Sequence, residues 1–536
     1  MVLYEIDTDK LIGKYINNIK SDPGCFLAVQ GNPDFGIIAV NVKREISKEE
    51  GNRLPNDDEI PIYSARQLAS IGVDEDYPLD GTYIQMEMID LSREGNWIPI
   101  ANVDGENPEY FSGTFNGNGF TIRNLTIKRN EEYQGLFKRI SGELVDISLV
   151  NVDVNGNQYI GALVGDNHGT IKNCTSNGKV HGNSNIGGLV GINRCVLSGS
   201  ESECNVSGLN SIGGLVGGNQ DQGSIKNCNF IGKAIGEENS YSVGGIVGYN
   251  SNTVDNSHSS GDIFSGGSNT GGIAGANGGI ITESTSNGKI TGDINHTGGI
   301  VGYNDGEIKN SNFDGNILGD DRVGGIAGCN NNGGKVEDCH LDNSGVVSGR
   351  VSVGGVVGSN INASVIDTCY SAGVVSGKEG STGGLVGYNE NSIVQKCYFT
   401  GSVNTSVSSW GVGGLVGRNT GMTGGISNSY STGSVSGSGG ANMGGLVGYN
   451  DGNITNTYSI GTVDGIGDAV GGLVGFGDDS NIVNSYWDKE TSGKATSLGG
   501  GIGKNISEMK SKDTFIDWDF ETIWNIDDGV SYPYLR

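Results

Sequence analysis

The side chains best suited to acid–base chemistry are five histidines, and they are spread along the whole chain. They stand at His168, His181, His258, His296 and His340. General acid–base and nucleophilic catalysis both need a base within hydrogen-bond reach of the group it serves. The five occupy different repeats and different turn positions, so no nucleophile–base pair can be assigned. We expect no catalytic residues and predict that the protein is not an enzyme.

Candidate metal ligands are equally scattered. Asp320-Asp321 and Asp478-Asp479 are acidic pairs at expected turns, where solvated loops are the favoured interpretation and weak Ca²⁺ binding is the alternative. The nine cysteines include no CxxC pair, so the spacing of a zinc ribbon is missing. We therefore predict no cofactor and no metal site, apart from weak Ca²⁺ binding at the acidic turns.

Five tyrosines form the series most suited to recognition. They recur at one position of consecutive repeats, at Tyr370, Tyr398, Tyr430, Tyr458 and Tyr486. Each lies between two positions expected to point inward, so we predict an outward file of rings. Such a file suits the binding of sugar rings or of another protein. The alternative is that the rings only stabilise one another across repeats.

These series exist because the chain contains twelve copies of a GG-[LI]-V-G segment, some of them with one residue changed. The first glycines of the copies are Gly161, Gly187, Gly213, Gly244, Gly271, Gly298, Gly324, Gly354, Gly383, Gly413, Gly444 and Gly471. The steps between them are 26–31 residues, which indicates one supersecondary unit per repeat, stacked on its neighbours. Glycine makes up 96 of the 536 residues without a collagen-like period, so it serves in turns and close packing.

Each repeat contains short extended runs separated by turns such as Asn-Asp-Gly. We predict an all-β fold: a right-handed parallel β-solenoid with about three short strands per coil, the hand following the general crossover preference. A helix over residues 64–71 would cap the first coil. Aromatic residues after Trp487 would close the far end.

The expected organisation has four parts. Residues 1–58 form a small α+β attachment or assembly module, with a helix over 8–20 and a strand pair over 25–29 and 35–42. Residues 59–159 hold the cap and the first coils. Residues 160–488 hold the twelve repeats, and residues 489–536 form the C-terminal cap.

Aligned repeats place like residues in files. One file is expected to be a structural ladder of stacked amides, with ligand binding as the alternative: Asn167, Asn193, Asn219, Asn250, Asn277, Asn304, Asn330, Asn360, Asn389, Asn419 and Asn450. A second file of small residues is expected to be buried, with its thiols reduced: Cys174, Cys204, Cys228, Ser257, Ser284, Ser311, Cys339, Cys369, Cys397, Ser429, Thr457 and Ser485. Two places further on, an inward file includes Phe230, Phe313, Leu341 and Phe399.

Charge limits the partners. The chain has 33 Lys and Arg against 61 Asp and Glu, a net charge of −28. Such a surface repels nucleic-acid phosphate and anionic membranes, so neither is an expected partner. No apolar run approaches 18 residues, so we expect no membrane insertion. The start has no basic region followed by an apolar run; we expect export without the Sec pathway, or a leader that has been removed.

The GG-[LI]-V-G element resembles the repeat of the GLUG family of bacterial proteins. The run from Ile62 to Leu68, the segment from Gly113 to Gly119 and the closing Ser485-Tyr486-Trp487-Asp488 are similar to segments that flank such arrays. The resemblance covers residues 60–536. It implies a surface or adhesin-like protein in an extracellular setting, and it transfers no catalytic residue, because no HExxH motif is present.

Three functions follow as hypotheses. The first is a non-enzymatic rod of a bacterial extracellular or particle surface, which displays a ligand-binding face and is anchored by residues 1–58. Its partners would be a glycan or a surface protein, with self-assembly through residues 1–58. The second is a structural subunit of a spore layer, phage tail-like particle or filament. The third is a polysaccharide-acting β-helix enzyme, which rests on fold analogy alone.

Overall fold

The computed structural model describes residues 53–101, 109–406, 409–438, 442–466 and 469–536, and the backbone of two earlier strands. Those strands, β1 (Phe26–Asn32) and β2 (Gly36–Lys43), form an antiparallel pair. This pair matches the strand pair expected over residues 25–29 and 35–42. The helix expected over 8–20 lies outside the described residues.

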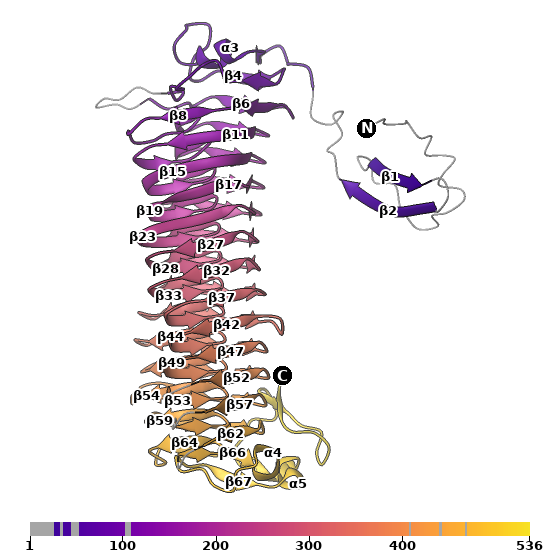
Figure 1. Cartoon of the computed structure of the whole chain (residues 1–536), viewed down its shortest axis with the longest axis vertical. Coiled ribbons are helices and arrows are strands. Elements are labelled where there is room, and N and C mark those ends of the chain that lie inside the picture. Colours follow the sequence, from indigo (N-terminus) through magenta and orange to yellow (C-terminus); the bar gives the residue numbers. More distant parts are fainter. Residues whose placement is uncertain are drawn as a thin grey trace.

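From residue 60 onward the chain forms a parallel β-solenoid, which Figure 1 shows as a straight rod. One sheet of sixteen strands runs from β3 (Ile60–Ile62) to β65 (Ile482–Val483), and one of thirteen runs from β9 (Phe137–Ile140) to β64 (Val474–Gly477). A third sheet takes the other coil strands. The predicted all-β parallel solenoid is confirmed.

A single coil shows how the three sheets are supplied. The strands of this coil are β33 (Asn295–Gly298), β34 (Val301–Asn304), β35 (Glu307–Lys309), β36 (Asn312–Phe313) and β37 (Asn316–Leu318). β34 belongs to the thirteen-stranded sheet, β35 to the sixteen-stranded sheet and the other three to the third sheet. The three expected runs are therefore split into five short strands, because sharp corners interrupt them.

The corner between β35 and β36 uses a left-handed residue in nearly every coil. Asparagine is common there, with φ between 43° and 54° at Asn173, Asn227, Asn256, Asn310, Asn428, Asn456 and Asn484. Asparagine tolerates this conformation better than other non-glycine residues. Glu283, Thr368 and Lys396 adopt it as well, with φ of 48°, 53° and 51°. The stacked neighbours thus impose the corner even on residues that disfavour it.

The paired glycines of the repeat are needed for close approach. A Cβ on Gly298 would lie 2.0 Å from the carbonyl oxygen of Val301. A Cβ on Gly299 would lie 2.0 Å from the carbonyl oxygen of Gly325 in the next coil and 2.4 Å from Cγ of Phe313. Contacts this short cannot be accommodated without moving the backbone. The GG pair therefore sets the distance between coils.

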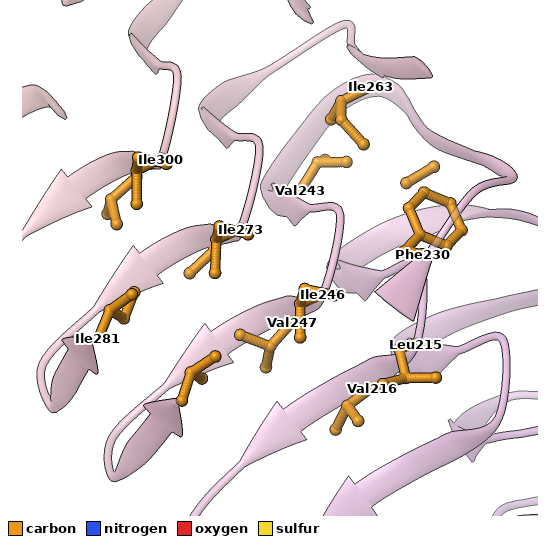
Figure 2. Packing of buried hydrophobic residues seen from close by; sticks show 14 of the residues in the cluster. Leu215, Val216, Phe230, Val243, Ile246, Val247, Ile263, Ile273, Ile281 and Ile300 are labelled. Carbon is orange, nitrogen blue, oxygen red and sulfur yellow. The ribbon is translucent and has the colours of Figure 1, made fainter. Parts of the chain in front are cut away.

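One continuous apolar core runs through the rod. In Figure 2 the residues of successive coils lie one above the next, as Leu215, Ile246, Ile273 and Ile300 do, and all four are fully buried. The cluster extends from Ile62 to Trp487. Each coil is thin, so it gains its buried area from the coils above and below.

The file of small residues is present, with one correction. Cys174, Cys228, Cys339, Cys369 and Cys397 are fully buried. Cys204, however, does not belong to it: the backbone N–H of Cys174 donates to Ser200 Oγ at 3.1 Å, and Ser200 occupies the position in that coil. The assignment was wrong because it took the cysteine of that coil by residue type, whereas the strand register of β17 (Val196–Ser198) places Ser200 above Cys174.

Both ends of the rod are covered. The predicted N-terminal helix is α3 (Ala65–Ala69), capped by Ser64, whose Oγ accepts from the N–H of Gln67 at 3.4 Å. Its Leu68 is fully buried.

At the other end, β67 (Ile502–Lys504) adds to β66 (Tyr486–Asp488) as the last parallel strand. The helix α4 (Lys489–Ser492) comes between these two strands in the chain, and α5 (Ile506–Met509) follows β67. The chain then turns back along the rod to the pair β68 (Trp524–Asn525) and β69 (Tyr534–Leu535), which Figure 1 draws in yellow.

Candidate functional site

The asparagine file forms an unbroken interior ladder. Each Nδ2 donates to Oδ1 of the asparagine in the next coil, at 2.6–2.9 Å, through all ten steps from Asn167 to Asn450. All eleven side chains are buried. In addition, Nδ2 of Asn304 donates to the carbonyl oxygen of Gly306 at 3.0 Å. Donors and acceptors in the ladder bond one another or their own turn, which favours the structural interpretation over ligand binding.

The ladder ends where the residue type changes. Asn167 pairs in register with Ile140 on one side, and Asn450 pairs with Gly477 on the other. The two end positions thus supply no side-chain amide to continue the series. The ladder coincides with the repeats and does not extend into the caps.

The tyrosine file is a stack of nearly parallel rings. His340, Tyr370, Tyr398, Tyr430 and Tyr458 follow one another at centroid distances of 4.7–5.1 Å, with interplanar angles of 4–6°. Rings this close and this parallel cover much of each other's faces. Burial raises the pKa of Tyr370 and of Tyr398. The geometry favours mutual stabilisation over a flat platform for sugar rings.

Two of the five tyrosines expected on the surface are buried. Tyr458 is 1% exposed and Tyr486 is 2% exposed. The returning C-terminal segment covers them: the hydroxyl of Tyr458 donates to the carbonyl oxygen of Pro533, and Trp524 lies 6.1 Å from the Tyr458 ring. The expectation of a five-ring surface was wrong because this cover comes from residues far along the chain.

A second outward aromatic file was missed from the sequence. The residue before each ladder asparagine lies on the outer side of its strand. The last three such residues are Tyr388, Arg418 and Tyr449, and Phe476 pairs with Tyr449 at the same position of the next coil, before Gly477. They lie on β49 (Val386–Glu390), β54 (Val416–Thr420), β59 (Val447–Asn450) and β64. We call these four residues the Arg418 file. Their fixed place after V-G was the signal that could have identified them.

The histidines make separate local contacts. His181 lies close to both a hydroxyl group and a carboxylate: its Nδ1 is 3.0 Å from Ser207 Oγ and 3.7 Å from Glu237 Oε1. A triad needs the hydroxyl and the carboxylate on opposite ring nitrogens, whereas here both approach the same one. His296 is packed against Arg322 and Tyr303, and burial lowers its pKa to about 4.

The candidate cation ligands are engaged elsewhere or isolated. Arg350 donates to both carboxylate oxygens of Asp320, at 2.7 and 3.0 Å. Asp478 accepts from the backbone N–H of Ser480 at 2.9 Å. Within the described ranges, no group of three or more His, Cys, Asp or Glu residues is placed to hold a metal ion.

The buried thiols are expected to have low reactivity. The eight described cysteines are all free, and seven of them are buried. Burial raises the pKa of Cys174 and of Cys228 to about 12. Since the thiolate is the reactive form, these side chains act as small core residues.

The repeats of this chain are similar to a known sequence motif. Six segments match the sequence profile of the GLUG motif: residues 156–180, 208–235, 239–263, 294–318, 379–404 and 408–436. Halomucin of Haloquadratum walsbyi (strain DSM 16790 / HBSQ001) is 37% identical over 109 residues, which is 20% of this chain and 1% of that protein. The chain therefore spans a very small part of this relative's length.

A structural comparison adds a distant neighbour. The crystal structure of a proposed immunoglobulin A1 protease from Bacteroides ovatus aligns over 89% of this chain and 92% of its own, with 14% identity and a TM-score of 0.20. In the part of the chain that the structure describes, no helix is long and apolar enough to cross a membrane.

Proposed function

Six segments of the repeat array match the GLUG motif, and on that premise we propose that this protein is a non-enzymatic rod of an extracellular or particle surface. Its role is to hold ligand-binding side chains away from the point of attachment. The match to halomucin supports the surface setting. The observation that carries the proposal is the unbroken asparagine ladder, which ties the coils from Asn167 to Asn450 into one body.

A rod that displays ligand-binding side chains must be rigid. Coils that share a core and a hydrogen-bonded ladder resist bending, because bending would break buried amide bonds. Caps at both ends keep the outer coils from pairing with other chains. Such a body suits display and spacing. The scattered histidines and the neutralised Asp320 support a non-catalytic role.

Attachment belongs to residues 1–58 in this proposal. They precede the rod, and the first coil begins only at Ile60. Full-length protein is expected to stay on the producing cell or particle, whereas a chain starting at residue 59 is expected in the medium. Equal retention of the two forms would reject anchoring by this segment.

The surface role is tested on intact cells or particles. Antibodies against the rod are expected to label them without permeabilisation, and the purified full chain is expected to bind a glycan or a surface protein on an array. Products released from a polysaccharide panel would favour the enzyme alternative. Labelling only after permeabilisation would contradict the surface role.

A further inference from the structure

The Arg418 file differs from a stacked ladder in both composition and geometry. The Arg418 guanidinium carbon lies 5.7 Å from the centre of the Tyr388 ring and 5.1 Å from that of Tyr449. Tyr449 and Phe476 are 6.2 Å apart and tilted by 35°. The cation is thus held between two aromatic side chains, while Phe476 remains 51% exposed.

The charge of Arg418 is not neutralised by a carboxylate. No ion pair joins it to an Asp or Glu among the residues that the structure describes, although the chain carries a net charge of −28. Other arginines do have such partners, as Arg350 has Asp320 and Glu379. Nε of Arg418 is enclosed without an acceptor. One carboxylate beside the file is bound to a tyrosine: the Tyr449 hydroxyl donates to Asp451 Oδ2 at 2.7 Å.

A β-bulge brings a further exposed ring to this place. In β53 (Ser409–Gly413), Ser409 pairs with Gly380 and Gly411 with Ser381, so Trp410 is the extra residue. It is 68% exposed. Bulges of this kind redirect a side chain and are common beside functional sites.

The bulge lies directly against the Arg418 file. A Cβ on Gly411 would fall 2.5 Å from the carbonyl oxygen of Gly417 and 3.3 Å from the backbone N of Tyr449. Asn442 in the next coil fixes the bulge by donating to the carbonyl oxygen of Trp410 at 3.0 Å. The bulge in β53, a strand of the third sheet, therefore lies against the backbone of β54 and β59, and Trp410 is the exposed residue next to this contact.

Exposed aromatic surface around an unpaired guanidinium has a defined chemical complement. A pyranose ring presents an apolar face that packs on aromatic side chains, and a carboxylate accepts two parallel hydrogen bonds from a guanidinium. We propose that Trp410, Arg418, Tyr449 and Phe476 form a binding site for a sugar that carries a carboxylate, such as a uronic acid unit. Neighbouring Asp451 would accept from the hydroxyl groups of the sugar.

This site deepens the proposed function by naming a ligand class, and it rests on the rod being a binder. The two can fail separately, because surface labelling does not depend on Arg418. Binding in vitro, in turn, does not depend on where the protein is found.

The test uses the full chain and isothermal titration with a galacturonic acid trisaccharide and its methyl ester. The free acid is expected to bind about 10–100-fold more tightly than the ester, the range for a charged hydrogen-bonded pair. Arg418→Gln should remove that preference. Arg350→Gln, which deletes the same charge elsewhere, should leave it within about 2-fold.

Trp410→Ala tests the contribution of the aromatic ring separately from that of the charge. This variant should bind the acid and the ester more weakly by the same factor. Circular dichroism and unfolding midpoints establish that each variant is folded. Equal affinity for acid and ester, unchanged binding by Arg418→Gln, or no binding of either sugar at millimolar concentration would overturn the proposal.

Discussion

Two outward aromatic files run along this rod on different sheets, and they do different things with the same residue types. In the tyrosine stack each ring lies about parallel to the next, so the faces of His340, Tyr370 and Tyr398 are covered by one another. In the Arg418 file the rings are tilted or separated by a cation, and the bulge exposes Trp410 beside them. Side chains that satisfy one another hold the fold, whereas those left without a partner are free to bind.

The asparagine ladder is the interior counterpart of the tyrosine stack. Both repeat one residue per coil, and both are self-complementary. The ladder is sealed from water, so a break in it leaves polar atoms buried; a break in the tyrosine stack leaves a gap that water fills. Removing one residue from a file is therefore expected to cost more free energy of unfolding inside the rod than on its surface.

The largest expected effect comes from the glycine pair that sets the coil spacing on which both files depend. Gly299→Ala places a Cβ 2.0 Å from the Gly325 oxygen, and we expect a loss of about 3 kcal/mol or more in unfolding free energy. Gly278→Ala is the matched control, because the nearest atom to its Cβ would be 3.7 Å away. Equal midpoints in denaturant for the two variants would contradict the steric account.

Next in size is a break in the middle of the ladder. Asn304→Ala removes one of the acceptors of Asn277 Nδ2, which keeps the carbonyl oxygen of Gly279, and it removes the donor to Oδ1 of Asn330. We expect a cost of about 1–3 kcal/mol, because two buried hydrogen bonds are lost and a buried acceptor is left unpaired. Asn316→Ala, at an exposed position of the same coil, should change stability by no more than about 0.5 kcal/mol. A ladder variant as stable as this control would refute the energetic role.

A smaller effect is expected on the pH dependence of stability, and it comes from Tyr458 at the covered end of the tyrosine stack. Burial raises the pKa of Tyr458 well above its usual value near 10. The folded state therefore keeps the proton more tightly than the unfolded state does. The stability that this group contributes is complete below about pH 10 and falls as the pH rises further, by about 1.4 kcal/mol per pH unit.

Fluorescence of Trp518 and Trp524 follows this alkaline transition, because both rings pack near Tyr458. Tyr458→Phe has no group to ionise at that position, so the release of the C-terminal segment should move to higher pH. An unchanged transition in this variant would show that another group controls the cap.

The sequence was sufficient to predict the features that recur at the same position of every repeat. The solenoid, the ladder asparagines and the inward Phe230 and Phe313 follow from the period, because stacking demands the same environment at the same position. Ser64 and its helix followed from local capping chemistry. These elements depend on neighbours in sequence or on the repeat itself.

The remainder depends on contacts that no periodicity encodes. Tyr458 and Tyr486 were expected on the surface, but residues tens of positions later in the chain cover them: Pro533 and Trp524 contact Tyr458, and Phe515 and Trp518 contact Tyr486. Trp410 is exposed because it is the extra residue of a β-bulge. The sequence predicts neither which way a returning segment folds nor how a bulge turns its side chain.

The most direct test measures ligand affinity and unfolding midpoint on the same samples of two variants, Tyr370→Ala/Tyr398→Ala and Arg418→Gln. We expect the double tyrosine variant to lose about 1–2 kcal/mol of stability and to bind the acidic trisaccharide like the parent. Arg418→Gln should keep its midpoint and lose the acid preference. If removing the tyrosines abolishes binding while Arg418→Gln binds normally, the division between self-satisfied and binding side chains is contradicted.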